Sequence, residues 1–169
     1  MKSTRKRHPF WHAVWETICW DPINKRIAWK ESGLNSLVDE GEENIGDVYF
    51  RELSVPTEFY LRLCNDTLTE TDTLNTILGE MSGYGYTPAL LERTSVGWPT
   101  KELYLGDWRF TSKQITVTAS GGAIGPFNTQ FLATTSTNLG KLIAFKDLSQ
   151  PRTILNGNVM LTRFRVTFK

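Results

Sequence analysis

The chain has 169 residues, of which 40% are hydrophobic and 22% are charged. This length and composition are typical of one globular domain with its own hydrophobic core. No apolar run approaches the roughly 18 residues that a membrane-spanning helix needs, so we exclude a helical membrane protein and expect no membrane partner. The basic first residues are not followed by an apolar segment, and we therefore expect no secretory signal peptide.

The net charge of +1 conceals an uneven distribution of charge along the chain. The first acidic residue is Glu16, and four basic residues precede it: Lys2, Arg5, Lys6 and Arg7. Taking these four from the 19 basic residues leaves 15 against 18 acidic ones. The sequence therefore predicts an extended basic arm, residues 1–12, and a single mildly acidic domain, residues 13–169. Such an arm either contacts phosphates or an acidic groove, or is simply solvated. Because the body has no basic excess, nucleic-acid contact is expected only through the arm.

Two segments rich in aromatic and β-branched residues come next, FWHAVWETICW and IAWK, on either side of DPINKR. This pattern predicts a β-hairpin over about residues 13–30. Four of the six tryptophans lie in this region: Trp11, Trp15, Trp20 and Trp29. Tryptophan is enriched at the energetic centres of protein interfaces, and a domain of this size buries only some of its tryptophans. The four are therefore candidates for apolar anchors into a neighbouring chain, with the protein core as the alternative.

Helical signals are few and short. SGLNSLVDEG, residues 32–41, has a capping serine, apolar residues at helical spacing and a terminal glycine, which predicts a short helix. EFYLRLCN, residues 58–65, alternates as a strand does. DTLNTIL, residues 72–78, is predicted to form a second short helix or a turn.

From about residue 82 the pattern is that of short strands separated by Gly, Pro and Asn turns. We expect strands in the segments GYGYTPALLERTSVGW, LYLGDWRFTSKQITVTASGG, FNTQFLATTS and KLIAFKDLS, followed by QPRTILNGN as a connection. Residues 160–168 alternate strictly and are predicted to pair in the middle of a sheet, with Arg163 and Arg165 on the outward face. The predicted fold is mainly β: a β-sandwich or jelly-roll-like domain with one or two short helices and an extended N-terminal arm.

Residues with catalytic or metal-binding chemistry are sparse. His8 and His12 lack a third ligand nearby, and the carboxylates of DTLTETD, residues 66–72, match no calcium loop. Asn138-Leu139-Gly140-Lys141 lacks the remaining residues of a phosphate loop and is predicted to be a turn. Cys19 and Cys64 show no metal spacing, and we expect both to be reduced and buried. We therefore predict no catalytic residue, no metal site and no cofactor, and hence a protein that is not an enzyme.

The order of five segments resembles a diffuse family of tailed-bacteriophage virion structural proteins, of head-decoration or tail-associated type. The segments are WETICWDPINKRIAWKES, GLNSLVDEGEENIGDVYF, FYLRLCN, GEMSGYGYTPALLERTSVGW and GKLIAFKDLSQPRTILNGNVMLTRFRVTF. The resemblance covers about residues 11–169 and leaves out the basic residues 1–9. It implies a β-rich domain in a repeated protein lattice and offers no catalytic residue.

This resemblance implies a virion protein, most specifically a capsid decoration or cement protein that binds the major capsid protein or other virion proteins, as a homo-oligomer or bound to the lattice. We expect charge contacts from Arg5, Lys6 and Arg7. We expect apolar anchor contacts from Trp11, Trp15, Trp20 and Trp29. One alternative is a neck, tail or baseplate adaptor. Another is a receptor- or glycan-binding module with exposed aromatic residues at loop tips: Tyr84, Tyr86 or Trp98.

Overall fold

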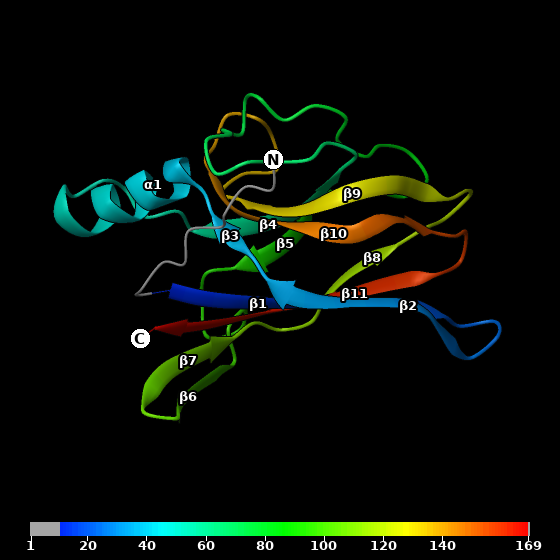
Figure 1. The fold of residues 1–169 in the computed structure, drawn as a ribbon, viewed down its shortest axis with the longest axis horizontal. Coiled ribbons are helices and arrows are strands. Elements are labelled where there is room, and N and C mark those ends of the chain that lie inside the picture. The colour runs from blue at the N-terminus through cyan, green and yellow to red at the C-terminus, as the bar shows by residue number, and fades with distance from the viewer. Residues whose placement is uncertain (1–10, 169) are drawn as a thin grey trace.

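The computed structural model describes residues 11–168, which form two antiparallel β-sheets packed face to face (Figure 1). The predicted mainly β fold is therefore confirmed, with one helix in the described residues. Residues 1–10, which include Arg5, Lys6 and Arg7, lie outside the described part of the chain, as does the side chain of Trp11.

The first sheet has the strand order β2-β1-β11-β7-β6, and β8 also pairs with β11. Its strands are β1 (Trp11–Asp21), β2 (Arg26–Leu34), β6 (Thr100–Tyr104), β7 (Asp107–Thr111), β8 (Ile115–Thr118) and β11 (Val159–Phe168). The second sheet has the order β3-β10-β9-β4-β5. Its strands are β3 (Ser36–Leu37), β4 (Glu58–Cys64), β5 (Ala89–Glu92), β9 (Ile124–Ala133) and β10 (Leu142–Ile154).

β11 lies in the middle of the first sheet, as its regular alternation predicts. It pairs with β1 along one edge and with β7 and β8 along the other. Met160, Thr162, Phe164 and Val166 are buried, and Arg163 on the opposite face is exposed. Pairing on both edges satisfies the backbone groups of this strand and fixes which face meets the core.

The main core lies between the two sheets. Trp15 of β1 meets Phe164 of β11 edge to face, with 4.5 Å between the ring centroids. The facing sheet contributes Leu61, Phe127 and Ile154, all fully buried. A second cluster, which includes Leu68, Leu74 and Phe131, covers the other face of the second sheet. Strand β4 is therefore buried on both faces over its last four residues.

The β1–β2 hairpin is longer than predicted. It starts at Trp11 and ends at Leu34, instead of covering about residues 13–30, so residues 11 and 12 belong to a strand and not to the predicted arm. Asp21 closes the turn by accepting hydrogen bonds from the N–H groups of Ile23 and Asn24. A hydrogen bond from the Asn24 side chain, together with these two backbone bonds, lowers the pKa of Asp21 below its usual value.

The prediction of a helix over residues 32–41 is wrong. Leu34 pairs with Val14 of β1, and Leu37 pairs with Ala144 of β10, so sheet pairing overrides the local helical spacing. The only helix in the described residues is α1 (Asp39–Phe50), in the acidic stretch that follows. Carboxylates in its first turn lie near the positive end of the helix dipole.

Of two other segments, the first agrees with its expected structure and the second differs. Residues 72–78, predicted as a helix or a turn, form turns. Residues 150–154, predicted as part of a connection, continue β10, and only residues 155–158 link it to β11. Arg152 of this extension pairs with Phe127 of β9, which shows that strand pairing extends past Pro151.

Candidate interaction surface

One end of the sandwich exposes a concentration of large apolar side chains. In Figure 1 this end is at the left, where α1 and the β6–β7 hairpin both extend beyond the stacked sheets. Two groups of residues make up this surface, which we call the apolar end. The group from α1 and the segment after it is Tyr49, Phe50, Leu53 and Val55; the group from the hairpin is Leu103, Tyr104, Leu105 and Trp108. Soluble monomers rarely expose apolar patches of this kind unless they bind a partner.

The tip of the β6–β7 hairpin is unusual for its chemistry. Leu105 and Gly106 both have positive φ, 52° and 91°, as a tight two-residue hairpin turn requires. Glycine and asparagine adopt this conformation readily, whereas leucine is strained there. Leu105 is 87% exposed, so burial of its side chain in the folded protein does not offset the backbone strain. A leucine that is both strained and exposed points to a role in contact with another molecule.

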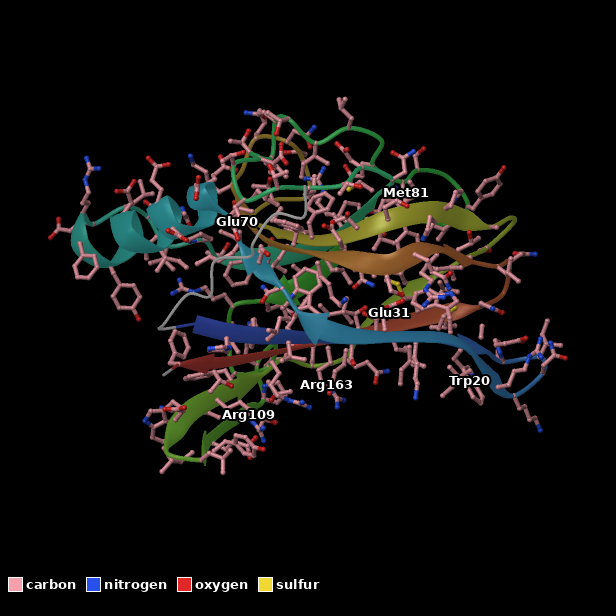
Figure 2. All side chains as sticks on the ribbon, viewed as in Figure 1. Trp20, Glu31, Glu70, Met81, Arg109 and Arg163 are labelled. Carbon is pink, nitrogen blue, oxygen red and sulfur yellow. The ribbon has the colours of Figure 1, made fainter. Side chains whose placement is uncertain are left out.

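Cations hold the aromatic rings of this hairpin in place. The guanidinium carbon of Arg109 lies 3.8 Å from the ring centroid of Tyr104, and Lys101 Nζ lies 4.9 Å from that of Trp108. Arg109 also donates from Nη2 to Glu102 Oε1 at 2.7 Å. Figure 2 shows Arg109 on this hairpin, beyond the stacked part of the two sheets. Rings fixed in this way lose little side-chain entropy when a partner covers them.

An apolar groove joins the hairpin to α1. Its first lobe, about 560 Å³, is lined by Phe59, Trp98, Phe110 and Val166, with Arg93 and Lys101. Its second lobe, about 460 Å³, runs under α1 past Ile45 and Val48. Phe59, Arg93 and Phe168 line both lobes. The two exposed groups of the apolar end therefore flank two adjoining depressions that share part of their lining.

The predicted tryptophan anchors have different positions. Trp15 is wrong as an anchor, because only 1% of it is exposed and its ring packs on Phe164. Trp29 is partly buried against the core, and its Nε1 donates to the carbonyl of Thr153 at 2.9 Å. Trp20 lies on the outer face of the first sheet, away from the second sheet, as does Arg163 (Figure 2). Of the three described anchors, only Trp20 presents its ring to the outer surface.

The other surface residues singled out by the sequence are also separated. Arg165 binds Glu16 on the outer face of the first sheet through two hydrogen bonds of 3.0 and 3.1 Å. Tyr86 is wrong as a loop-tip aromatic, because it is buried and its hydroxyl accepts the N–H of Leu63 at 2.9 Å. Tyr84 is exposed, and Trp98 lines the groove.

Arg62, a buried cation of β4 in the second sheet, has several structural partners. Arg62 is 2% exposed and donates to both carboxylate oxygens of Glu80, to the carbonyl of Thr137 at 2.8 Å and to Asn138 Oδ1 at 2.7 Å. Tyr86 donates to the same Glu80 carboxylate at 3.2 Å. This network attaches two long loops to β4, and each of the three guanidinium nitrogens of Arg62 donates to at least one acceptor.

The two cysteines are buried and free, which confirms the expectation for both. Burial raises the pKa of the Cys19 thiol to about 11 and that of Cys64 to about 12. A thiol with such a pKa is protonated at neutral pH and is a poor nucleophile.

Residues with metal-binding chemistry do not converge within residues 11–168. There, no group of three or more His, Cys, Asp or Glu side chains is arranged to hold a metal ion. In the predicted acidic loop, Asp66 accepts the N–H of Thr67, and Asp72 accepts the N–H and hydroxyl of Thr69. The one helix in the described part of the chain, α1, is not long and apolar enough to cross a membrane.

The sequence analysis does not predict the apolar end, because it expects strands in LYLGDWRFTSKQITVTASGG without assigning a hairpin to this segment. The missed signal is Leu105-Gly106 between two runs with aromatic residues, which is the pattern of a tight hairpin. The exposure of its rings does not follow from the sequence, because it depends on how far the second sheet extends.

No protein-family model matches the chain, and no curated protein matches it.

Proposed function

We propose that this chain is a non-enzymatic structural protein that attaches to a larger assembly through its apolar end. The observation that carries this proposal is the pairing of a strained, exposed Leu105 with exposed Trp108 on one projecting hairpin. Neither residue contributes to the core between the sheets. Their retention on the surface is physically reasonable if a partner covers them.

We further propose that the assembly is the virion of a tailed bacteriophage and that the chain is a capsid decoration or cement protein. The ordered resemblance of residues 11–169 to virion structural proteins supports the virion. A repeated lattice also suits a small binding domain, because many weak contacts add through multivalency. In this proposal the apolar end contacts the major capsid protein, and the basic residues 2–7 add charge contacts.

A single substitution at the hairpin tip tests the attachment. Leu105→Asn places a residue that tolerates positive φ at the strained position, so the folded protein should be as stable as wild type or slightly more stable. The same change removes the apolar tip and should lower co-sedimentation with virions of the phage that encodes the chain at least tenfold.

The matched control is Ile23→Asn, which removes a similarly exposed apolar residue from the β1–β2 turn at the other end of the first sheet. Binding of this variant should equal that of wild type. If Leu105→Asn binds as wild type while a variant without residues 1–10 fails, attachment through the apolar end is refuted and the basic arm takes its place.

A neck, tail or baseplate adaptor would use the same apolar end in a ring of few copies. Counting copies per purified virion distinguishes the two locations, because the copy number of a decoration protein scales with the number of capsid subunits.

A further inference from the structure

The groove between α1 and the β6–β7 hairpin carries charge of only one sign. Its two lobes are lined mainly by apolar and aromatic side chains, and the charged residues in the lining are Arg93 and Lys101. No carboxylate lines either lobe. An apolar surface with two fixed cations favours a ligand that combines apolar groups with negative charge.

The partners of these two cations leave their charge uncompensated among the described residues. Arg93 donates to the carbonyl of Pro56 at 3.4 Å, which positions the guanidinium without neutralising it. Lys101 Nζ lies over the rings of Trp108 and Phe110, 4.9 and 6.0 Å from their centroids. Glu102, which follows Lys101 directly in β6, forms its ion pair with Arg109 instead.

The form of the groove indicates a polypeptide and not a compact small molecule. One lobe alone would have enough volume for a small molecule, and here two such lobes lie next to each other. The lobes adjoin each other, since Phe59 and Arg93 line both, and exposed apolar residues extend the surface at both ends. An extended segment can place one large side chain in each lobe and still contact Tyr49 at one end and Trp108 at the other.

We propose that this groove binds an extended segment of the partner protein in which large apolar side chains alternate with aspartate or glutamate. The apolar side chains enter the two lobes, and a carboxylate between them pairs with Arg93 and Lys101. This inference deepens the proposed function, since it names the chemistry of the partner at the same end of the molecule. The hairpin tip at Leu105 lies outside the groove lining, so the two proposals fail separately.

A displayed library of random nonapeptides tests this chemistry without assuming a sequence. The library is selected on the full chain and counter-selected on the double variant Arg93→Glu, Lys101→Glu. We expect the enriched peptides to contain at least two large apolar residues and at least one Asp or Glu between them. A set with no acidic enrichment, or no enrichment over the counter-selection, overturns the inference.

The best peptide is then synthesised with each acid replaced by its amide. Fluorescence anisotropy should show at least a tenfold loss of affinity for the amide version, and the acidic peptide should bind more weakly as salt is raised. Arg93→Gln and Lys101→Gln should each weaken the acidic peptide and leave the amide version unchanged. Lys30→Gln, an exposed change on β2, is the control and should change neither.

Two further outcomes also contradict the inference. Equal affinity for the acidic and amide peptides would make the groove a purely apolar site. Peptide binding that appears only after deletion of residues 1–10 would mean that the groove binds the chain's own N-terminal residues. If the peptides fail in these ways while Leu105→Asn still abolishes virion binding, only the groove inference is lost and the proposed function stands.

Discussion

The first sheet has a hairpin at each edge, and the two hairpins use their aromatic residues in opposite ways. In the β1–β2 hairpin, Trp15 is fully buried and Trp29 donates a hydrogen bond to the facing sheet. In the β6–β7 hairpin, Tyr104 and Trp108 remain exposed and stack with cations of their own hairpin. The difference is one of coverage: the second sheet lies across β1, whereas β6 and β7 project beyond it (Figure 1). Aromatic content therefore predicts apolar area, and the extent of the facing sheet decides whether that area becomes core or interface.

The largest expected effect separates these two roles of tryptophan. Trp15→Ala should lower the free energy of unfolding by about 3–5 kcal/mol, because it leaves a large cavity beside Phe164. Trp108→Ala, the matched change in the other hairpin, should alter it by no more than about 0.5 kcal/mol. Urea denaturation followed by circular dichroism measures both values, and equal losses for the two variants would end the distinction between the hairpins.

A smaller effect compares ion pairs inside and outside the body of the sandwich. Glu80→Ala removes the carboxylate partner of buried Arg62 and should cost roughly 3 kcal/mol, because a cation is left buried without its counter-charge. Glu102→Ala removes the carboxylate partner of Arg109 in the exposed hairpin and should cost less than about 1 kcal/mol. The measurement is again urea denaturation at neutral pH. Similar costs would mean that the hairpin is as tightly integrated as β4.

The smallest effect concerns the dependence of stability on pH. Burial alone would raise the pKa of Glu31, but hydrogen bonds from Ser149 and Arg152 outweigh burial and hold that pKa below its usual value of 4.5. A carboxyl with a lowered pKa stabilises the folded state above the unfolded-state pKa, and this contribution is lost as the pH falls through the folded value. The free energy of unfolding should therefore fall more steeply below pH 4.5 in wild type than in Glu31→Gln.

Thermal unfolding over a series of pH values measures this difference. Leu139→Asn, an exposed change that removes no ionisable group, is the control and should follow the wild-type curve. Parallel curves for wild type and Glu31→Gln would show that the contact between β2 and β10 adds no acid-sensitive stability.

Much of the fold could be predicted because its signals are local. The alternation of residues 160–168 gave the right strand, and the DPINKR turn gave the right hairpin. The helix was misplaced because Leu34 and Leu37 fit helical spacing and edge-strand pairing equally well, and only distant strands decide between them. The apolar end could not be predicted for the same reason, since the exposure of its side chains depends on how the two sheets pack. The roles of Arg5, Lys6, Arg7 and Trp11 remain predictions, because these side chains lie outside the described residues.

The central position of β11 has a consequence for biogenesis. Trp11 at the start of β1 pairs with Phe168, so the first sheet joins residues from opposite extremes of the described chain. During synthesis β1 can therefore pair with β11 only after all the intervening strands have been made, and an isolated β1–β2 hairpin is only marginally stable in water. Such distant pairing slows folding. The aromatic face of β1 is exposed to aggregation or chaperone binding until β11 pairs with it.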